Sequence, residues 1–320
     1  PENSCMKKFL CYSVLSALVL LYSDAVHAQQ QSYPNTLLWR TTGNKLHKPS
    51  YLFGTMHLED RRLFMFGDSL YSCLERAEGF AMEINPDSAM IAMFKAMNEP
   101  DTTGLLKDVL TKKELDRLSK PLQKKYGISA DKITRKQAWM YSYDRMKTKK
   151  PDDMETAVDT YLYNLAKRQG KWVGGIEDIE DQLGLVEELG AGFDAQGMLA
   201  DGGGKKQVDK LIQIYLAQDL NAIRDWIGSM EDDTRDEMLI RRNIKMAYRM
   251  DSMAHVRSNF FAVGAAHLPG KDGLIELLEG QGFTVEPIFA SKKISPETYT
   301  YQSVALPWFK VEDKDKTYTV

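Results

Sequence analysis

The sequence predicts an α/β (α+β) fold with one mixed β-sheet. The sheet is built from N-terminal and C-terminal strands, is flanked by helices, and carries a large helical insertion. Strand-like apolar segments occur within residues 37–84 and again within 259–289, whereas residues 88–169 carry apolar side chains at three-to-four spacing. The composition, with 43% hydrophobic and 27% charged residues, is that of a globular protein. We therefore expect strands from both ends of the chain to share a single sheet.

Short apolar runs bounded by turn residues predict the N-terminal elements. These are, in order, strands at 37–41 and 51–53, a helix at 68–77 and a strand at 79–84. Gly43-Asn44 provides turn chemistry between the first two strands. Asn85-Pro86 ends the third strand.

Helical periodicity dominates the middle of the chain. The predicted helices are 105–126, 136–146, 155–168, 179–189, 207–227 and 231–253. A short strand at 171–176 interrupts them, and the glycines at 202–204 predict a flexible turn. The chain then returns to the sheet with a strand at 259–263, a helix at 274–279 and a strand at 283–289.

Residues 1–28 have the pattern of a secretory signal peptide. Met6-Lys7-Lys8 precedes an apolar run at 9–22, and Ala28 ends a small-residue cleavage site, so residues 1–5 are interpreted as an upstream extension. An uncleaved N-terminal anchor is the alternative. We expect export to the bacterial envelope, either periplasmic or extracellular, with no transmembrane domain after signal cleavage.

Cleavage after residue 28 would remove two of the three cysteines and leave Cys73, so we expect no intrachain disulfide. The main domain is placed at 29–290, with helical insertions at about 88–169 and 190–256 and a polar C-terminal tail at 291–320. A net charge of −3 without a long basic run argues against nucleic acid as a partner.

Two predicted strands are followed by the same local pattern, Gly-x-x-His. Gly54 precedes His57 after the strand at 51–53, and Gly264 precedes His267 after the strand at 259–263. Glycine lets the backbone approach a neighbour closely where a Cβ would obstruct it. If the two strands lie side by side, both imidazoles reach one edge of the sheet, where open α/β sheets bind ligands.

Two carboxylates follow strands in the same way. Glu83 ends the strand at 79–84, and Glu177 follows the strand at 171–176. Imidazoles together with a carboxylate form a common ligand set for divalent metals. Four apolar strands therefore end in side chains suited to metal binding or acid–base chemistry.

Other candidates have a plain structural interpretation beside the functional one. Arg242 and Asn243 fall mid-helix, where they would form a solvated face or instead orient ligands or a developing oxyanion. Asp159 lies among apolar helix residues, and a partly buried carboxylate requires a partner. His47 is expected at the surface in a turn, and His255 after a helix end, where a cation suits the helix dipole.

The end motifs resemble those of a known family. Tyr-Leu-Phe-Gly-Thr-Met-His at 51–57 and Phe-Phe-Ala-Val-Gly-Ala-Ala-His-Leu-Pro-Gly-Lys-Asp-Gly-Leu at 260–274 are similar to the opening and closing motifs of the TraB/PrgY/GumN family. The similarity covers about residues 37–289. It implies a relation to the TIKI metalloproteases, and more distantly to erythromycin-esterase and ChaN-type haem-binding folds.

By this resemblance His57, Glu83 and His267 take metal or catalytic roles, with Arg242 and Asn243 in support. The family often has glycine two residues before its aspartate, where this sequence has Ala157. We therefore rank Asp159 and Glu177 as second-tier site residues.

The resulting hypothesis is an exported hydrolase that depends on a divalent metal (Mn, Co or Zn) and acts on a peptide or protein substrate. His57 and His267 would hold the metal, Glu83 would ligate it or act as general base, and Arg242 would steady the oxyanion. Neither a His-Glu-x-x-His nor a Gly-x-Ser-x-Gly motif is present. The alternatives are a non-catalytic protein that sequesters haem or a peptide signal, and a metal-independent esterase.

Overall fold

The computed structural model describes residues 32–89, 91, 104–108, 110–134, 150–178, 203–299, 310–313 and 316–319. The chain divides into two units, Pro1–Tyr33 and Pro34–Val320, and every helix and strand given below belongs to the second. The predicted signal peptide and the predicted helices at 136–146 and 179–189 lie outside the described residues.

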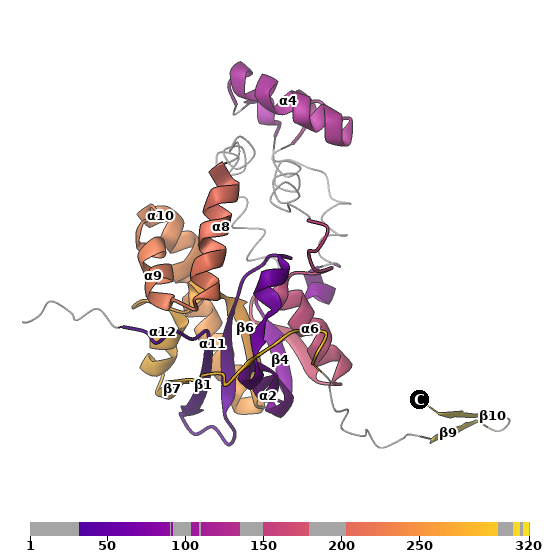
Figure 1. Cartoon of the computed structure of the whole chain (residues 1–320), viewed down its shortest axis with the longest axis vertical. Helices are drawn as coiled ribbons and strands as arrows, with labels where there is room; N and C mark the ends of the chain where they lie inside the picture. Colours follow the sequence, from indigo (N-terminus) through magenta and orange to yellow (C-terminus); the bar gives the residue numbers. More distant parts are fainter. Residues whose placement is uncertain are drawn as a thin grey trace, which may run out of the picture. The chain divides into compact units, whose positions relative to one another are not determined.

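A six-stranded mixed sheet forms the centre of the fold, in the order β5-β4-β6-β2-β1-β7 (Figure 1). The strands are β1 (Leu38–Gly43), β2 (Ser50–Thr55), β4 (Gly79–Met82), β5 (Trp172–Gly175), β6 (Asn259–Gly264) and β7 (Phe283–Pro287). Strands β2, β6, β4 and β5 are parallel, whereas β1 is antiparallel to both of its neighbours. The predicted fold class, a mixed sheet assembled from both ends of the chain, is therefore confirmed.

The C-terminal strand β6 lies between the N-terminal strands β4 and β2. Its register pairs Phe260 with Phe80 on one side, and Gly264 with Thr55 on the other. Because β2, β4, β5 and β6 are parallel, their C-terminal ends meet along one side of the sheet, which we call the carboxyl edge. The register thus brings the two Gly-x-x-His segments to the same edge.

Aromatic side chains form much of the core around β6. The rings of Phe80 and Phe260 are stacked with centroids 6.0 Å apart, and Phe53 lies 6.2 Å from Phe260. Phe260 and its neighbour Phe261 point to opposite faces and are both buried. Burial on both faces is what a central parallel strand requires, and it explains the continuous apolar run in the sequence.

Helices α2 (Asp68–Arg76), α4 (Lys112–Tyr126) and α6 (Val158–Arg168) belong to the first half of the described chain. The predicted helix at 105–126 was wrong at its beginning, because residues 106–108 form a separate 3-10 turn. Thr111 has extended backbone and forms a capping box with Glu114, which fixes the start of α4 at Lys112.

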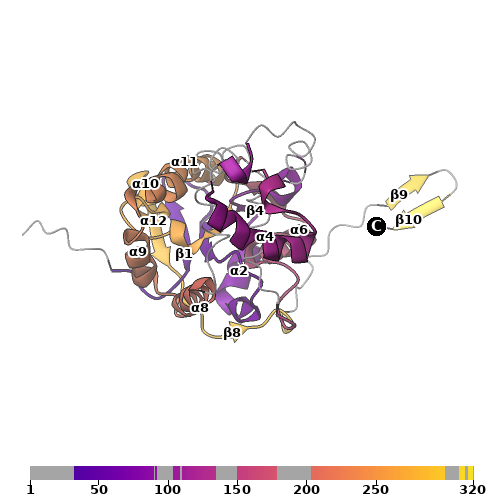
Figure 2. The same cartoon turned by 90° about the horizontal axis from the view of Figure 1, so that it is seen from above.

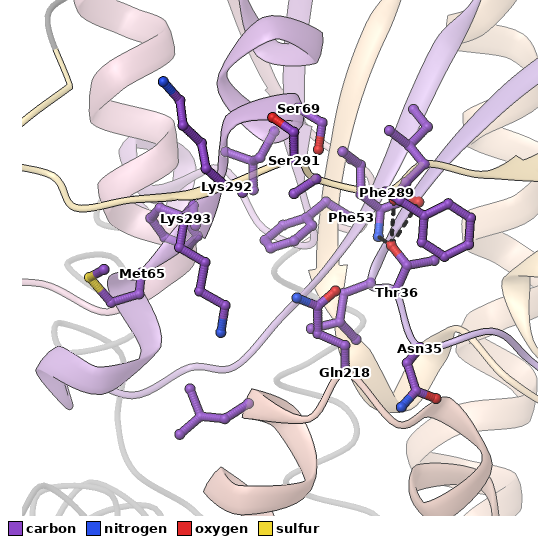
Figure 3. A pocket seen from close by; sticks show the side chains of 18 of the residues that line it. Asn35, Thr36, Phe53, Met65, Ser69, Gln218, Phe289, Ser291, Lys292 and Lys293 are labelled. Atoms are coloured by element: carbon purple, nitrogen blue, oxygen red, sulfur yellow. Dashed lines mark hydrogen bonds between the residues drawn. The ribbon is translucent and has the colours of Figure 1, made fainter.

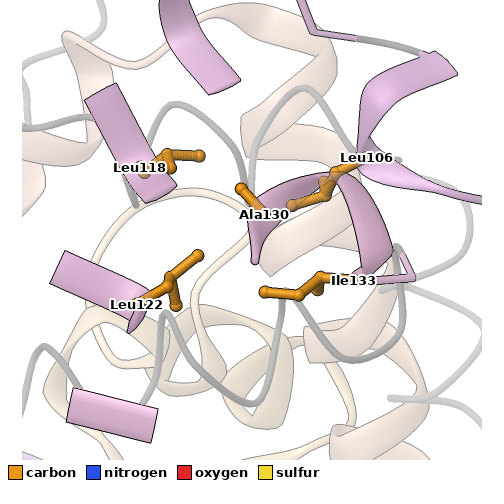
Figure 4. Packing of buried hydrophobic residues seen from close by; sticks show 5 residues of the cluster. All are labelled: Leu106, Leu118, Leu122, Ala130 and Ile133. Atoms are coloured by element: carbon orange, nitrogen blue, oxygen red, sulfur yellow. The ribbon is translucent and has the colours of Figure 1, made fainter. Parts of the chain in front are cut away.

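Residues around α4 have a small hydrophobic cluster of their own (Figure 4). Its fully or nearly fully buried members are Leu106, Leu118, Leu122, Ala130 and Ile133. The backbone N–H of Leu106 donates to the Ile133 carbonyl at 2.9 Å, which closes the segment around α4. This part of the insertion therefore holds itself together by local apolar contacts.

The second half of the described chain contains α8 (Gly203–Leu216), α9 (Leu220–Gly228), α10 (Asp232–Arg235), α11 (Arg241–Val256) and α12 (Leu274–Gly280). Helices α9 to α12 group together (Figure 2), and α11 contacts β6 while α12 contacts β7. The single helix predicted at 207–227 was wrong. Gln218 has φ 55°, and the Asp219 carboxylate accepts the Ala222 N–H at 3.0 Å, which ends α8 and begins α9.

The structure differs from two further predictions in this half of the chain. Helix α8 already begins at Gly203, inside the glycine run that predicted a flexible turn. The helix predicted at 231–253 is continuous in space, but a π-helical turn at Asp236–Ile240 separates α10 from α11. A π-turn inserts one residue into the helical register, and such turns are frequent at functional sites.

Short strands complete the described chain. Strand β8 (Lys293–Ile294) pairs with β3 (Phe66–Gly67), and β9 (Lys310–Asp313) pairs with β10 (Lys316–Thr319). Across the described residues, no helix combines the length and apolar character needed to cross a membrane.

Cys73 of α2 is a free, buried thiol, and burial raises its pKa to about 11. In a Cys5→Ser/Cys11→Ser chain at about pH 8, we therefore expect a thiol reagent to leave Cys73 unmodified until denaturant is added. Rapid, complete labelling of the folded protein would contradict the burial of the Cys73 thiol.

Candidate functional site

The carboxyl edge brings together side chains that are distant in the sequence. His57 and His267 follow β2 and β6, and Glu83 follows β4. The Nε2 atom of His57 lies 3.3 Å from Glu83 Oε1, and the Nε2 atom of His267 lies 3.7 Å from the same oxygen. Both imidazoles therefore face one carboxylate oxygen.

Glu83 is the buried centre of this site, with 8% of its side chain exposed. Its Oε1 accepts the backbone N–H of Gly264 at 2.6 Å, and its Oε2 accepts Arg242 Nη2 at 2.7 Å. Burial alone would raise the pKa of Glu83, but the positive charges of His57 and Arg242 outweigh burial and hold that pKa well below its usual range. Glu83 is therefore an ionised carboxylate held in a fixed orientation.

Arg242 joins Glu83 to the second buried carboxylate, Glu177. Its Nε donates to Glu177 Oε1 at 2.8 Å, and its Nη2 donates to Glu177 Oε2 at 2.6 Å. A third nitrogen, Nη1, donates to the carbonyl of Met238 in the π-turn at 3.0 Å. The two carboxylates share one guanidinium, and this fork geometry fixes both of them.

His267 is buried and held by Asn243, the residue after Arg242. The His267 Nδ1–H donates to Asn243 Oδ1 at 2.6 Å, while Asn243 Nδ2 donates to the carbonyl of Asp272 at 2.7 Å. Because the amide nitrogen must donate to that carbonyl, its oxygen must accept from the ring, which leaves the Nε2 lone pair toward Glu83. Burial lowers the pKa of His267 to about 4, so the ring is neutral at neutral pH.

His57 is the more open of the two rings, with 47% of its side chain exposed. Its Nδ1–H donates to Asp159 Oδ2 at 2.8 Å. Burial lowers the pKa of His57, but Glu83 and the hydrogen bond to Asp159 outweigh that effect and raise it well above its usual value. Asp159, expected to need a partner, thus has one in His57, and its buried Oδ1 has no hydrogen-bond donor among the described residues.

The loop that carries His57 is fastened to the segment before α6. The Asp60 carboxylate accepts Lys150 Nζ at 2.8 Å and Arg62 Nη2 at 2.7 Å. The Glu59 carbonyl accepts the Met154 N–H at 2.8 Å. Together with the His57–Asp159 bond, these contacts hold the loop at several points.

The two glycines of the Gly-x-x-His motifs allow neighbouring atoms to approach the backbone closely. Neither glycine adopts an unusual backbone conformation. A Cβ on Gly264 would lie 3.2 Å from Glu83 Oε1 and 3.4 Å from His57 Nε2, and a Cβ on Gly54 would lie 2.7 Å from a methyl of Leu268. A larger residue in place of Gly264 would protrude into the site. A larger residue in place of Gly54 would displace the loop after β6.

Comparison with known proteins adds the evolutionary context of this geometry. The model of the TraB/PrgY/gumN family matches residues 37–287, a range that contains every side chain of the site. The chain belongs to the TraB/PrgY/gumN family.

Several curated proteins are similar to this family member. It is 24% identical to Metalloprotease TIKI2 of Xenopus tropicalis over 87% of its own length and 66% of the relative's. It is 24% identical to the Metalloprotease TIKI homolog of Nematostella vectensis (81% and 70%) and 25% identical to Metalloprotease TIKI1 of Danio rerio (80% and 64%). The chain thus spans about two thirds of the length of these relatives.

The two imidazoles and the carboxylate of this TraB/PrgY/gumN protein are side chains of the kinds that bind divalent metals. Both imidazoles have Nδ1 engaged by a hydrogen bond and Nε2 turned toward Glu83, which is the arrangement that orients metal-binding histidines. Tetrahedral sites with bonds of about 2.0–2.1 Å separate ligand atoms by about 3.3 Å, close to the two Nε2–Oε1 distances. Among the described residues, no group of three or more His, Cys, Asp or Glu is already arranged around a common metal position. The rings contact the carboxylate itself, so binding would require them to open slightly.

Sequence reasoning identified the side chains of the site but not the backbone groups that hold them. The Gly264 N–H and the carbonyls of Met238 and Asp272 give no signal in a single sequence because every residue has them. The bidentate use of Glu177 by Arg242 was also missed, since only the fold brings them together. Outside the site, His255 lies in the last turn of α11, not after its end, and its ring bonds two backbone carbonyls at the surface.

We expect Arg242→Gln to lower the free energy of unfolding by about 3–5 kcal/mol, because it leaves two buried carboxylates without their cation. The side chains of Glu83 and Glu177 are only 8% and 2% exposed. Urea unfolding at matched m-value measures the change.

Arg241→Gln is the matched control. The neighbouring Arg241 has a 59% exposed side chain and pairs with Asp236 at the surface, so its loss should cost less than about 1 kcal/mol. Equal destabilisation by the two variants would show that the buried network contributes no more than a surface ion pair.

Proposed function

We propose that this protein is an exported hydrolase that depends on a divalent metal and cleaves peptide bonds. One observation carries the proposal. The Nε2 atoms of His57 and His267 lie 3.3 Å and 3.7 Å from Glu83 Oε1, and both Nδ1 atoms are engaged by Asp159 and Asn243. Similarity to proteins named metalloproteases supports the choice of reaction.

His57, His267 and Glu83 would hold the metal, which is Mn, Co or Zn. When bound, such an ion lowers the pKa of a coordinated water toward neutrality and polarises a carbonyl. Asn243 holds the His267 ring with Nε2 toward Glu83, and Asp159 does the same for His57. These bonds raise the basicity of the rings and fix their orientation.

Glu83 has the position of a general base or of a third ligand. Its carboxylate is ionised, so Oε1 can accept a proton from a water held near the rings. Arg242 donates to both Glu83 and Glu177, so most of its N–H groups are already used within the protein. We therefore assign Arg242 the task of orienting Glu83 in preference to contacting an oxyanion.

The substrate would approach from the side of His57, because that ring is half exposed whereas His267 and Glu83 are buried. A peptide or protein is the proposed substrate. The pattern at residues 1–28 supports a secretory signal, and we propose a periplasmic or extracellular location in a bacterial envelope.

A metal-independent hydrolase is the second candidate, and one contact favours it. His57 donates Nδ1–H to Asp159 and its side chain is half exposed, the arrangement of an imidazole general base oriented by a carboxylate. If the metal-independent candidate is right, a chelator leaves hydrolysis unchanged. The effect of a chelator on activity therefore distinguishes the two candidates.

For the first candidate we expect the purified protein to retain about one divalent ion per chain and to cleave a quenched-fluorescent peptide mixture. A chelator should abolish cleavage, and added Mn, Co or Zn should restore it. His57→Ala and His267→Ala should lose both the ion and the activity. Elemental analysis and the peptide assay on the same preparations measure both quantities.

His255→Ala is the control, because His255 is a surface histidine outside the site. It should keep the metal content and activity of the unaltered chain. A protein that binds none of the three metals and cleaves no peptide in their presence would refute the proposal.

A further inference from the structure

A second cleft lies apart from the residues of the proposed metal site. It has a volume of about 310 Å³, at the lower end of the range for small-molecule sites. Its walls come from the approach to β1, from β2, from the segment between Leu63 and Leu70, from the end of α8 and from residues 288–293 (Figure 3). None of its lining residues belongs to the His57–Glu83–His267 cluster.

The floor of the cleft is apolar, and large apolar side chains are also exposed at its mouth. Phe53, Leu63 and Leu70 line it and are buried. At the mouth, Met65 is 45% exposed and Phe289 is 61% exposed, although both are large apolar side chains. Exposed apolar groups gathered at one concave place mark a binding surface more often than chance exposure does.

Charged and polar groups lie on one side of the same cleft. Lys292 and Lys293 are exposed, and neither ammonium forms an ion pair with any described residue. The nearby carboxylate of Asp68 accepts the N–H groups of Ser69 and Ser291, both at 2.9 Å, so its oxygens are already used locally. In Figure 3 the Lys293 side chain extends across the cleft, whereas that of Lys292 points away from it, so Lys293 presents its positive charge to a ligand that enters.

Gln218 adds a polar group inside the cleft. It adopts φ 55° at the break between α8 and α9, a backbone region that L-residues rarely occupy. Its side chain lies among the lining residues with Phe53 and Lys293 (Figure 3). Strained residues of this kind occur preferentially where a ligand is held.

We propose that this cleft binds a medium-chain aliphatic carboxylate. The alkyl chain would lie over Phe53, Leu63 and Leu70, and the carboxylate would meet the ammonium of Lys293. Charge complementarity selects an anion, because the Lys293 ammonium faces the cleft and forms no ion pair with any described residue. The apolar floor selects an alkyl chain over a highly polar anion.

Decanoate, below its micelle-forming concentration, is the probe, and calorimetric titration of the full chain without metal is the measurement. Lys293→Gln should weaken binding by up to about fivefold, which is what one partly exposed ion pair supplies, whereas Lys292→Gln should leave it unchanged. Lys293→Arg should retain binding. Phe289→Ser should weaken binding several-fold without affecting folding, because this side chain is 61% exposed.

The matched control is Lys112→Gln, which removes an exposed lysine on α4 that does not line the cleft. An equal loss in this control would show a nonspecific charge effect and overturn the proposal. Equal affinity for decanol would overturn the carboxylate assignment, and so would tighter binding of a short peptide with an apolar C-terminal residue. Absence of decanoate binding would also overturn it. Because the titration contains no metal, its outcome is independent of the proposed hydrolase.

Discussion

The buried charge of Glu83 is the constraint on which the site depends. A carboxylate at this depth is stable only if its oxygens are paired, and Arg242 and the Gly264 N–H provide that pairing. Arg242 in turn requires Glu177 and the π-turn carbonyl of Met238. The negative charge of Glu83 is thus fixed in place without a ligand, and the Nε2 atoms of both imidazoles face it.

This arrangement is possible because of the position of β6 in the sheet. A strand from near the C-terminus lies between two strands from near the N-terminus, so Gly264 comes next to Glu83 and close to His57. The position of β6 between these strands also buries Phe260 against Phe80 and Phe53. Core packing and site geometry are therefore set by one topological feature, and a change of register in β6 would disturb both.

Much of the sheet and of the site could be predicted from residues alone. Apolar runs ending in Gly-x-x-His or Glu indicated which side chains meet at the carboxyl edge, because parallel strands end together. The sequence could not show that β6 enters between β4 and β2, since pairing order depends on long-range packing. It also could not show the break at Gln218 or the π-turn before Arg242, where tertiary contacts override helical periodicity. The need of Asp159 for a partner was visible, but the identity of that partner was not.

The most direct test of this account is anomalous diffraction from crystals grown with Mn, Co or Zn, recorded at the absorption edge of the added metal. The account predicts a single strong peak bound by the Nε2 atoms of both His57 and His267, beside Glu83. A peak bound through Nδ1 of either ring, a peak elsewhere on the chain, or no peak at a saturating metal concentration would contradict it.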